Sequence, residues 1–393
     1  MAQRMEVERF LNRRLQAAFP SMEKVTERIS QESNLVFYFG IDPTGPELHL
    51  GHTVSLLILR QLIEWGHQVI LLIGDFTAQI GDPTDKSAAR QPLTREQVDK
   101  NSADYLNQVS KLLKPGSYTV RHNSEWLAQL NFEEVIKLAA KTTVQQMLAR
   151  DMFQERIKAG RPIGLHEFLY PLMQGYDAVA MRVDGEVGGS DQTFNMMMGR
   201  DLEWELIQKD KIVLATKFLE DPVTGKKLMS KSEGNYIALN GGPEQMFGGV
   251  MALGDNAILP LFQLSTTVDD EVLADISKRL TGGENPIISK KALAYEVVRM
   301  YHGEAAAQQA QDAFESTFSK GQVPEEMPGL AGADTELIDF LIKHHLVESR
   351  SEAKRLIEQK GVKINGVAAS SWETKLKAGD VIKLGSHRFV RVN

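Results

Sequence analysis

The chain of 393 residues contains no cysteine. This absence excludes disulfide bonds, thiolate catalysis, zinc sites with cysteine ligands and iron–sulfur clusters. Long apolar runs are also missing, since none reaches the length of a membrane span. Residues 1–14 are polar and charged and lack the apolar core of a signal peptide. We therefore expect a soluble, cytoplasmic protein without a membrane partner.

An excess of positive charge is absent from the chain as a whole, whose net charge is −7. This balance argues against a protein that coats nucleic acid over its entire surface. Residues 335–393, however, carry 11 Lys/Arg and 7 Asp/Glu, a balance of +4 that leaves −11 for residues 1–334. An acidic body with a basic tail indicates that the tail meets a polyanion, although an imbalance this small can also arise by chance.

Hydrophobic patterning indicates an α/β body. Residues 35–41 and 68–74 are short apolar runs typical of buried strands, and residues 50–65 between them have helical spacing and end before Gly66, a plausible C-cap. Strand, helix and strand at this spacing predict a βαβ unit and a parallel sheet. Further strands are expected at 118–122 and 211–216, and helices at 126–158 and 165–181.

Strand signals fade after Gly234, and residues 243–318 have mostly helical patterns. Residues 319–334 contain two Pro and three Gly and are typical of a linker. The sequence therefore predicts four parts: an α/β nucleotide-binding body with a helical insertion, a helical domain, a linker, and a small α+β module. Their predicted ranges are 1–235, 236–318, 319–334 and 335–393.

Asp42-Pro-Thr44 and His49-Leu-Gly51-His52 lie where the first strand passes into the first helix. Ligands of α/β sheets bind beyond strand carboxyl ends, and a helix N-terminus favours phosphate. Gly51 would allow a nucleotide to approach the backbone. The two histidines can share a helical face and donate to phosphate oxygens in a transition state. The alternative is that they only cap the helix.

A second segment, Lys226 to Asn235, has the sequence KKLMSKSEGN. Its hydroxyls, lysines and glycine are typical of a phosphate-binding loop, whereas alone it could be a solvated basic turn. Together the two segments resemble the HIGH and KMSKS signatures of the class I aminoacyl-tRNA synthetases. That resemblance implies a Rossmann-like catalytic domain and ATP as a substrate accompanied by Mg²⁺, with no metal-ligating cluster needed. Leu228 replaces the first lysine of KMSKS, so the ATP role passes to Lys231 and that of Lys227 stays open.

A third set of residues resembles the tyrosyl branch of that family. Tyr170, Gln174 and Asp177 share one helical face, Tyr38 lies near the end of the first strand, and a GGSDQ segment follows at 188–192. The resemblance implies that Tyr38 and Asp177 bind a substrate phenol, that Asp82, Tyr170 and Gln174 hold its ammonium group, and that Gln192 lies nearby. The alternative is a buried polar network that only stabilises the core.

The same resemblance assigns the remaining site residues. It places Thr44, His49 and His52 on phosphates, Asp42 in the nucleotide pocket, Gly189 and Asp191 on the ribose, and Lys86 and Arg90 on pyrophosphate.

The tail shows helical patterns at 336–346 and from Ser349 onward, with Ser351 as a plausible N-cap, then an Asn365-Gly366 hairpin turn. It resembles an RNA-binding module that is shared with a ribosomal small-subunit protein and ends many bacterial members of the tyrosyl branch. Arg350, Lys354, Arg355 and Lys363 would then meet tRNA phosphates, although any one of them could simply be solvated.

The implied activity is the joining of L-tyrosine to ATP, followed by transfer of tyrosine to the terminal ribose of its tRNA, by a homodimer. Two alternatives stay open: the tryptophanyl branch, and a catalytically inactive RNA-binding homologue.

Overall fold

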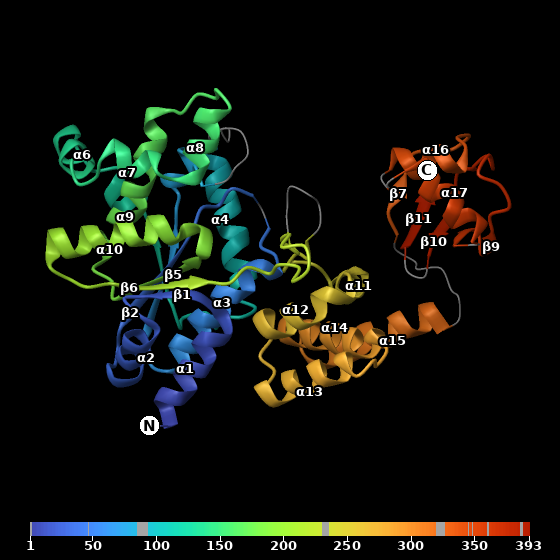
Figure 1. The fold of residues 1–393 in the computed structure, drawn as a ribbon, viewed down its shortest axis with the longest axis horizontal. Helices are drawn as coiled ribbons and strands as arrows, with labels where there is room; N and C mark the ends of the chain where they lie inside the picture. Colours follow the sequence, from blue (N-terminus) through green and yellow to red (C-terminus); the bar gives the residue numbers. More distant parts are fainter. Residues whose placement is uncertain are drawn as a thin grey trace.

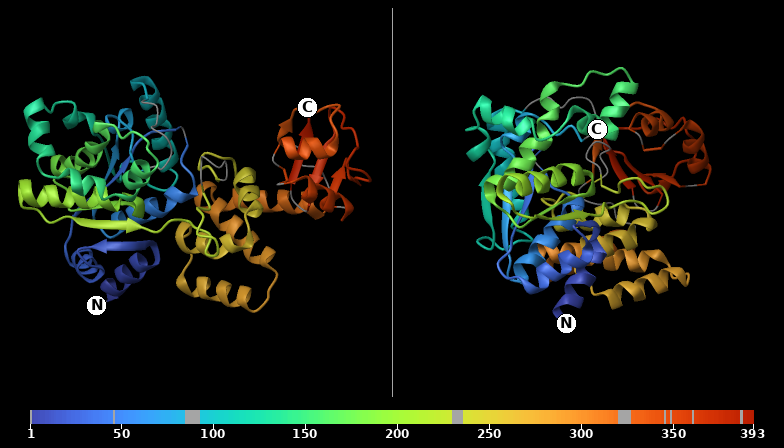
Figure 2. Two further views of the ribbon diagram at one scale, coloured as in Figure 1. Left: turned by 45° about the horizontal axis from the view of Figure 1, so that its top comes forward. Right: turned by 60° about the vertical axis from the view of Figure 1, so that its left-hand side comes forward.

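The computed structural model describes residues 2–45, 47–84, 93–229, 236–319, 327–344, 346–347, 349–359, 361–385 and 388–393. These residues form an α/β body, a cluster of helices and a small C-terminal module that stands apart from the body (Figure 1). The last helix of the cluster, α15 (Glu304–Ser319), extends toward the module (Figure 2).

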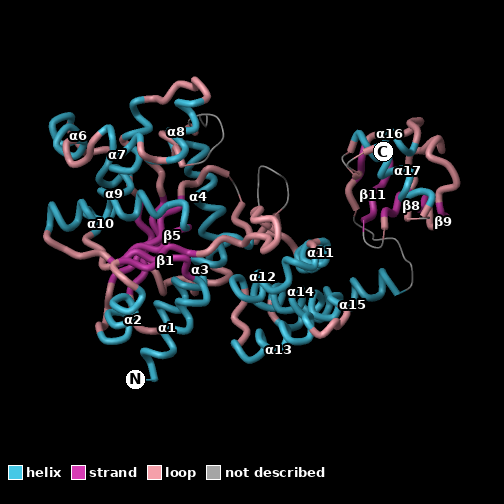
Figure 3. The backbone as a smooth tube through the Cα atoms, in the orientation of Figure 1, coloured by secondary structure: helices cyan, strands magenta, loops and turns pink. Residues whose placement is uncertain are grey.

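The body is built on a six-stranded sheet in the order β1-β6-β5-β2-β3-β4. Figure 3 shows the strands of this sheet in magenta among the helices of the body. The strands are β1 (Leu15–Phe19), β2 (Val36–Ile41), β3 (Gln68–Ile73), β4 (Thr119–His122), β5 (Gly185–Gly189) and β6 (Ile212–Thr216). All neighbours run parallel except β1, which pairs antiparallel with β6 at one edge. The predicted α/β class with a parallel sheet is confirmed, whereas β1 and β5 were not among the predicted strands.

Alternation along β2 separates two sides of the sheet. Phe37 and Phe39 enter the main core, which includes the apolar residues of α3 (Leu50–Glu64). Tyr38 points to the other side and packs with Leu72 and Ala178 beneath α9 (Tyr170–Met181). The polar residues that the sequence analysis selects on α9 and β2 therefore converge on one side of the sheet.

Helices cover both faces of the sheet. Those of the body are α1 (Ala2–Arg14), α2 (Met22–Gln31), α3, α4 (Arg95–Val109), α5 (Ser124–Leu127), α6 (Phe132–Ala139), α7 (Val144–Leu148), α8 (Asp151–Lys158), α9 and α10 (Thr193–Ile207), with 3-10 turns η1 (Thr77–Gln79), η2 (Leu165–Phe168) and η3 (Ser190–Gln192). The predicted helical insertion between β4 and β5 is confirmed.

The helical cluster contains α11 (Pro243–Ala252), η4 (Asp255–Ala257), α12 (Ile258–Ser265), α13 (Asp270–Thr281), α14 (Pro286–His302) and α15, as the sequence predicts. It shares the main core with the body. The guanidinium of Arg13 on α1 donates to the carbonyl oxygens of Phe262 at 2.8 Å and Gln263 at 2.6 Å, which ties α1 to the end of α12. In the described part of the chain no single helix is long and apolar enough to cross a membrane; only α11 with η4–α12, bent by 112°, passes as a pair.

The C-terminal module has its own core and a five-stranded sheet in the order β7-β11-β10-β8-β9. Its elements are β7 (Gly329–Leu330), α16 (Leu337–Lys343), α17 (Arg350–Glu358), β8 (Val362–Ile364), β9 (Val367–Ala368), β10 (Val381–Leu384) and β11 (Arg388–Val392). The predicted cap was wrong, because the side chain of Ser349, not Ser351, accepts from the backbone N–H of Glu352. β7 lies inside the segment predicted as a linker and pairs parallel with β11, so ordered structure begins before residue 335.

Candidate functional site

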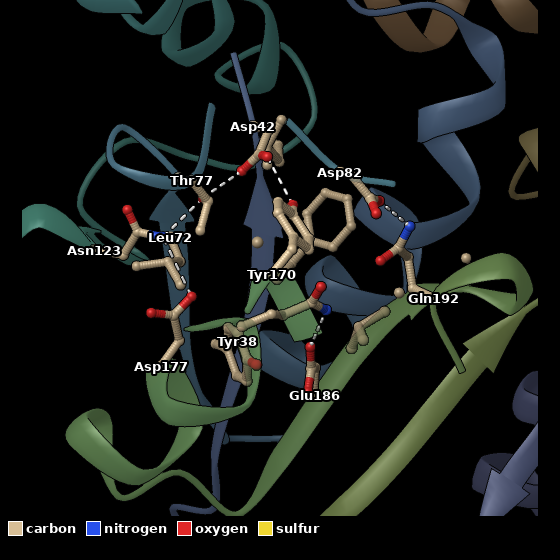
Figure 4. Close-up of a pocket in the computed structure, with 18 of the residues that line it drawn as sticks. Tyr38, Asp42, Leu72, Thr77, Asp82, Asn123, Tyr170, Asp177, Glu186 and Gln192 are labelled. Atoms are coloured by element: carbon tan, nitrogen blue, oxygen red, sulfur yellow. Dashed lines mark hydrogen bonds between the residues drawn. The ribbon is translucent and has the colours of Figure 1, made fainter. Parts of the chain in front are cut away.

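A pocket lies at the carboxyl ends of β2, β3 and β5, the position at which parallel sheets bind ligands (Figure 4). Most of the predicted tyrosine and nucleotide residues among those described line it. They are Tyr38, Asp42, Thr44, His52, Asp82, Tyr170, Gln174, Asp177, Gly189 and Gln192. Side chains that are separated by more than 100 positions in the sequence therefore meet in one site.

Tyr38 and Asp177 lie at the buried end of the pocket, with exposed fractions of 0% and 3%. The Asp177 carboxylate accepts from the indole N–H of Trp126 at 2.7 Å and from the amide of Asn123 at 3.3 Å. Burial raises the pKa of Asp177 well above its usual range despite these two donors. Burial, reinforced by the charge of Glu186, also raises the pKa of Tyr38. A hydroxyl entering here would meet a carboxylate that gains from a further donor.

Asp42, which the sequence analysis places only in the nucleotide pocket, bonds with two other side chains of the site. Its carboxylate accepts from the hydroxyl of Tyr170 at 2.7 Å and from that of Thr77 at 2.7 Å. Burial, with the charge of Asp42 next, raises the pKa of Tyr170. Tyr170, which the family resemblance groups with Asp82, is thus bonded to the residue predicted for the nucleotide pocket. Asp82 itself accepts from the amide of Gln192 at 2.8 Å (Figure 4).

The sequence does not single out three residues of the pocket: Asn123 and Thr77 connect Asp177 to Asp42, and Gly74 leaves room for Asp42. The Asn123 amide donates both to Thr77 Oγ1 at 2.9 Å and to Asp177. A Cβ on Gly74 would lie 1.9 Å from Asp42 Oδ1, so only glycine leaves room for that carboxylate. Gly74 and Thr77 follow β3, and Asn123 follows β4. Their place after strand ends was the signal that could have found them.

His49 and His52 form a reciprocal cap at the start of α3. The backbone N–H of Gly51 donates to Nδ1 of His49, and the backbone N–H of His49 donates to Nδ1 of His52, each at 3.1 Å. A Cβ on Gly51 would lie 2.8 Å from the His49 ring, which gives Gly51 a local reason besides the predicted approach of a nucleotide. His52 lines the pocket. The two histidines therefore cap α3 through their Nδ1 atoms, and a ligand role would use the Nε2 atoms.

Residues 237–239, which follow the KKLMSKSEGN segment, form backbone hydrogen bonds with residues 48–50 at the start of the HLGH segment. The backbone N–H of Leu50 donates to the carbonyl of Ile237 at 3.1 Å, and that of Leu239 to the carbonyl of Leu48 at 2.9 Å. Residues 230–235, including Lys231, and residues 85–92, including Lys86 and Arg90, lie outside the described residues. Among the described residues, those that follow this segment, from Ile237 to Leu239, lie beside the start of α3.

Lys227 reaches the predicted ribose residue. Its Nζ lies 3.9 Å from Asp191 Oδ2 and 4.2 Å from the centre of the Phe218 ring. Burial raises the pKa of Asp191, and the charge of Lys227 opposes that rise. Leu228, at the position of the missing lysine, is buried instead.

In the C-terminal module Arg350, Lys354, Arg355 and Lys363 are all exposed. The opposite face of α17 is held in the core by Ala353 and Ile357. Arg350 forms an ion pair with Asp339, and Lys354 Nζ lies 4.7 Å from the centre of the Trp372 ring. A group of three or more His, Asp or Glu side chains able to hold a metal ion is not found among the residues described above.

Known proteins share both the sequence and the architecture of this chain. The family model for tRNA synthetases class I (W and Y) matches residues 30–319, and that for the S4 domain matches residues 337–382. A tyrosine--tRNA ligase of Nitratidesulfovibrio vulgaris is 43% identical over 94% of both chains. That of Dehalococcoides mccartyi is 44% identical over 89% of both chains. The fold is also that of a C-terminally truncated mitochondrial tyrosyl-tRNA synthetase of Aspergillus nidulans, with TM-score 0.66 at 22% identity over 81% of this chain and 98% of that chain.

The chain therefore belongs to the class I aminoacyl-tRNA synthetases of the tyrosyl and tryptophanyl group, followed by an S4 domain. Within that group it belongs with the tyrosine--tRNA ligases, which it matches over nearly its full length. A tryptophanyl-tRNA synthetase of Plasmodium falciparum shares the fold at only 15% identity with a TM-score of 0.56 over 74% of this chain and 81% of that chain.

Proposed function

We propose that this chain joins L-tyrosine to ATP to form tyrosyl-adenylate and pyrophosphate, then esterifies tyrosine to the 3′-terminal ribose of its tRNA. The observation that carries this proposal is the polarity of the pocket. A tyrosine and an aspartate lie at its buried end, while the capped start of α3 lies toward its other end. A phenol fits the first environment and phosphate the second.

In this proposal Tyr38 and Asp177 bind the phenol hydroxyl, and Asp82, Tyr170, Gln174 and Gln192 surround the ammonium group. The ammonium group would sit among the carboxylates of Asp82 and Asp42, both of which already accept hydrogen bonds from pocket side chains. The substrate carboxylate is then directed toward the nucleotide.

ATP would lie along the start of α3 and the end of β5. Thr44, Lys86, Arg90, Lys231 and the Nε2 atoms of His49 and His52 would contact its phosphates, Asp42 and Gly51 would line its pocket, and Gly189 and Asp191 would hold its ribose. The Asp191 carboxylate lies within reach of Lys227, which we propose as a further contact that substitutes for the missing first lysine. Mg²⁺ would arrive on the ATP phosphates and neutralise their charge.

Chemically, the tyrosine carboxylate attacks the α-phosphorus and pyrophosphate leaves, and the tRNA 2′-hydroxyl then attacks the adenylate carbonyl. Neither step requires a nucleophile from the protein. Catalysis by these residues is positioning and stabilisation of charge on phosphate oxygens. Because its substrates are ATP and tRNA, we expect the enzyme to work in the cytoplasm.

Amino-acid-dependent exchange of pyrophosphate into ATP, without RNA, tests the proposal. We expect exchange with tyrosine and none above background with tryptophan or phenylalanine. Exchange with tryptophan would place the chain in the tryptophanyl branch functionally. Absence of exchange with every amino acid would indicate an inactive RNA-binding homologue.

Replacing His52 with Ala should lower the rate of adenylate formation by about 10²-fold, while the tyrosine KM stays nearly unchanged, because the ring acts on phosphate in the transition state. Because His52 also accepts from the backbone N–H of His49, His52→Gln is the matched control that can preserve the cap without an imidazole. Stopped-flow activation should be slow in both variants. A normal rate in His52→Gln would make the residue a cap only.

We also propose a homodimer and that the C-terminal module binds tRNA through Arg350, Lys354, Arg355 and Lys363. Support for the dimer is apolar exposure on the helical insertion: Phe132, Ile136 and Val144 are 80%, 54% and 61% exposed. Trp204, at the neighbouring end of α10, is 57% exposed, and Lys141 pairs with Glu205 there. Exposed apolar groups gathered in this way are typical of protein interfaces.

Light scattering after size exclusion should give twice the mass of one chain. Ile136→Glu should shift it to one chain, since a buried charge cannot be solvated in an apolar interface. Val367→Glu, at a valine of the C-terminal module that is 73% exposed, should remain dimeric. A monomeric wild-type chain would contradict the proposal.

A further inference from the structure

A chain of three side-chain amides links two carboxylates: Gln174 and Gln192 line the pocket, and Asn195, which is fully buried, does not. Gln174 donates through Nε2 to Glu186 Oε1 at 3.0 Å, and Gln192 donates through Nε2 to Asp82 Oδ2 at 2.8 Å. Between them Asn195 donates through Nδ2 to Gln174 Oε1 at 3.0 Å and to Gln192 Oε1 at 2.9 Å. Figure 4 shows Glu186 and the Gln192–Asp82 pair on the pocket wall.

The chemistry of the two ends sets the direction of every amide. A carboxylate only accepts hydrogen bonds, so each glutamine must turn its NH₂ group toward its carboxylate. The oxygen of each glutamine is thereby turned toward Asn195. The two N–H groups of Asn195 satisfy both oxygens. Reversing either glutamine amide would place N–H against N–H and oxygen against a carboxylate, and reversing Asn195 would place oxygen against oxygen. Asn195 is fully buried, and its Oδ1 has no hydrogen-bond partner among the described residues. The hydrogen bonds of its side chain are therefore those that its NH₂ group donates to the two glutamines.

Lys211 fixes the position of the Glu186 carboxylate. Lys211 is fully buried, and its ammonium group forms an ion pair with Glu186 Oε2. Glu203 also lies close to this lysine. Burial raises the pKa of Glu203 to about 8, so Glu203 is mostly protonated at neutral pH. The charge of Lys211 is then paired with that of Glu186 alone. A Cβ on Gly199 would lie 2.4 Å from Lys211 Nζ, so α10 makes room for the lysine with a glycine.

We propose that Asn195 and the Glu186–Lys211 pair are positioning residues that fix the orientation of the Gln174 and Gln192 amides, so that oxygen rather than NH₂ is presented to the substrate ammonium group. This inference rests on the proposed assignment of both glutamines to that group. Carbonyl oxygens attract a cation and amide hydrogens repel it. Selectivity for a substrate with an α-ammonium group is therefore decided one layer behind the glutamines.

The test compares L-tyrosine with 3-(4-hydroxyphenyl)propionate, which has hydrogen in place of the ammonium group. Dissociation constants of both are measured by calorimetry for wild type and for Asn195→Leu, which removes the central donor but keeps the volume close. We expect Asn195→Leu to reduce the preference for tyrosine by about tenfold, with little change for the propionate. In exchange assays the tyrosine KM should rise while kcat and the ATP KM stay nearly constant.

Two further variants keep the result interpretable. Glu186→Gln with Lys211→Met removes the ion pair behind Gln174 without leaving one partner unpaired, and should reduce the same preference. Asn123→Leu removes another buried amide, at the phenol end, and should weaken both ligands alike. Equal weakening of both ligands by Asn195→Leu would overturn the inference and leave a purely structural role. A wild-type protein that does not bind tyrosine would instead overturn the proposed function.

Discussion

A chain ending at Ser319 should form tyrosyl-adenylate at close to the full-length rate, whereas its charging of tRNA should fall by about 10²-fold or more. The residues assigned to tyrosine and ATP all precede α11, and they lie in a body whose core is separate from that of the C-terminal module. The module carries the +4 charge balance and the exposed basic residues of α17. Its loss should therefore remove phosphate contacts without disturbing the pocket.

The cut belongs after α15 because of β7. A cut after Gly332, inside the segment predicted as a linker, would leave β7 on the body and strip a strand from β11. Pyrophosphate exchange and aminoacylation should be measured side by side on the truncated chain. A full-length variant with Arg350→Gln and Lys354→Gln is the matched control: it should keep folding, lose part of the charging activity, and show a weaker salt dependence. Unchanged aminoacylation by the truncated chain would mean that the body holds tRNA by another surface.

Replacing Asp177 with Asn should lower kcat/KM for tyrosine by about 10²-fold, mainly through KM, and should relax the rejection of phenylalanine. Asp177 is 3% exposed, so water cannot enter to accept the phenol hydrogen bond in place of the carboxylate. A site built to accept a hydroxyl rejects the ligand that lacks it, as is known for tyrosyl-tRNA synthetases in general, because its polar group is left unpaired. The ATP KM should change little.

Asp75→Asn provides the matched control for this prediction. Asp75 is another fully buried aspartate at the end of β3, accepting from the Ser124 hydroxyl at 2.6 Å, but it does not line the pocket. It should alter thermal stability more than the tyrosine KM. If Asp177→Asn kept the wild-type tyrosine KM and the rejection of phenylalanine, the phenol would bind elsewhere.

Short-range features of the chain were largely predictable. β2, β3 and α3 follow from apolar runs and spacing, and the start of α3 from residues within three positions of one another. β5 was missed because three of its five residues are glycine, which weakens a strand signal. In the fold those glycines have reasons of their own: a Cβ on Gly185 would lie 2.3 Å from the Phe37 ring, and one on Gly188 would lie 2.8 Å from the Met196 sulfur. β7 was missed because its two residues form a strand only by pairing with β11.

The residues of the site also fall into those that the sequence predicts and those that only the fold reveals. Residues that belong to signature segments, such as His52, Gln174 and Asp177, could be selected from the sequence, because each motif is a short stretch of chain with a recognisable chemistry. Asn123, Glu186 and Asn195 belong to no such motif and were found only in the fold, which brings them to the site from the end of β4, from β5 and from α10. The sequence by itself determined the class of site, the order of its parts and the basic tail. The tertiary structure decided which polar groups bond across the pocket, because a hydrogen bond requires two atoms within about 3 Å. Only the register of the parallel strands and the packing of α9 and α10 set that distance between residues far apart in the chain.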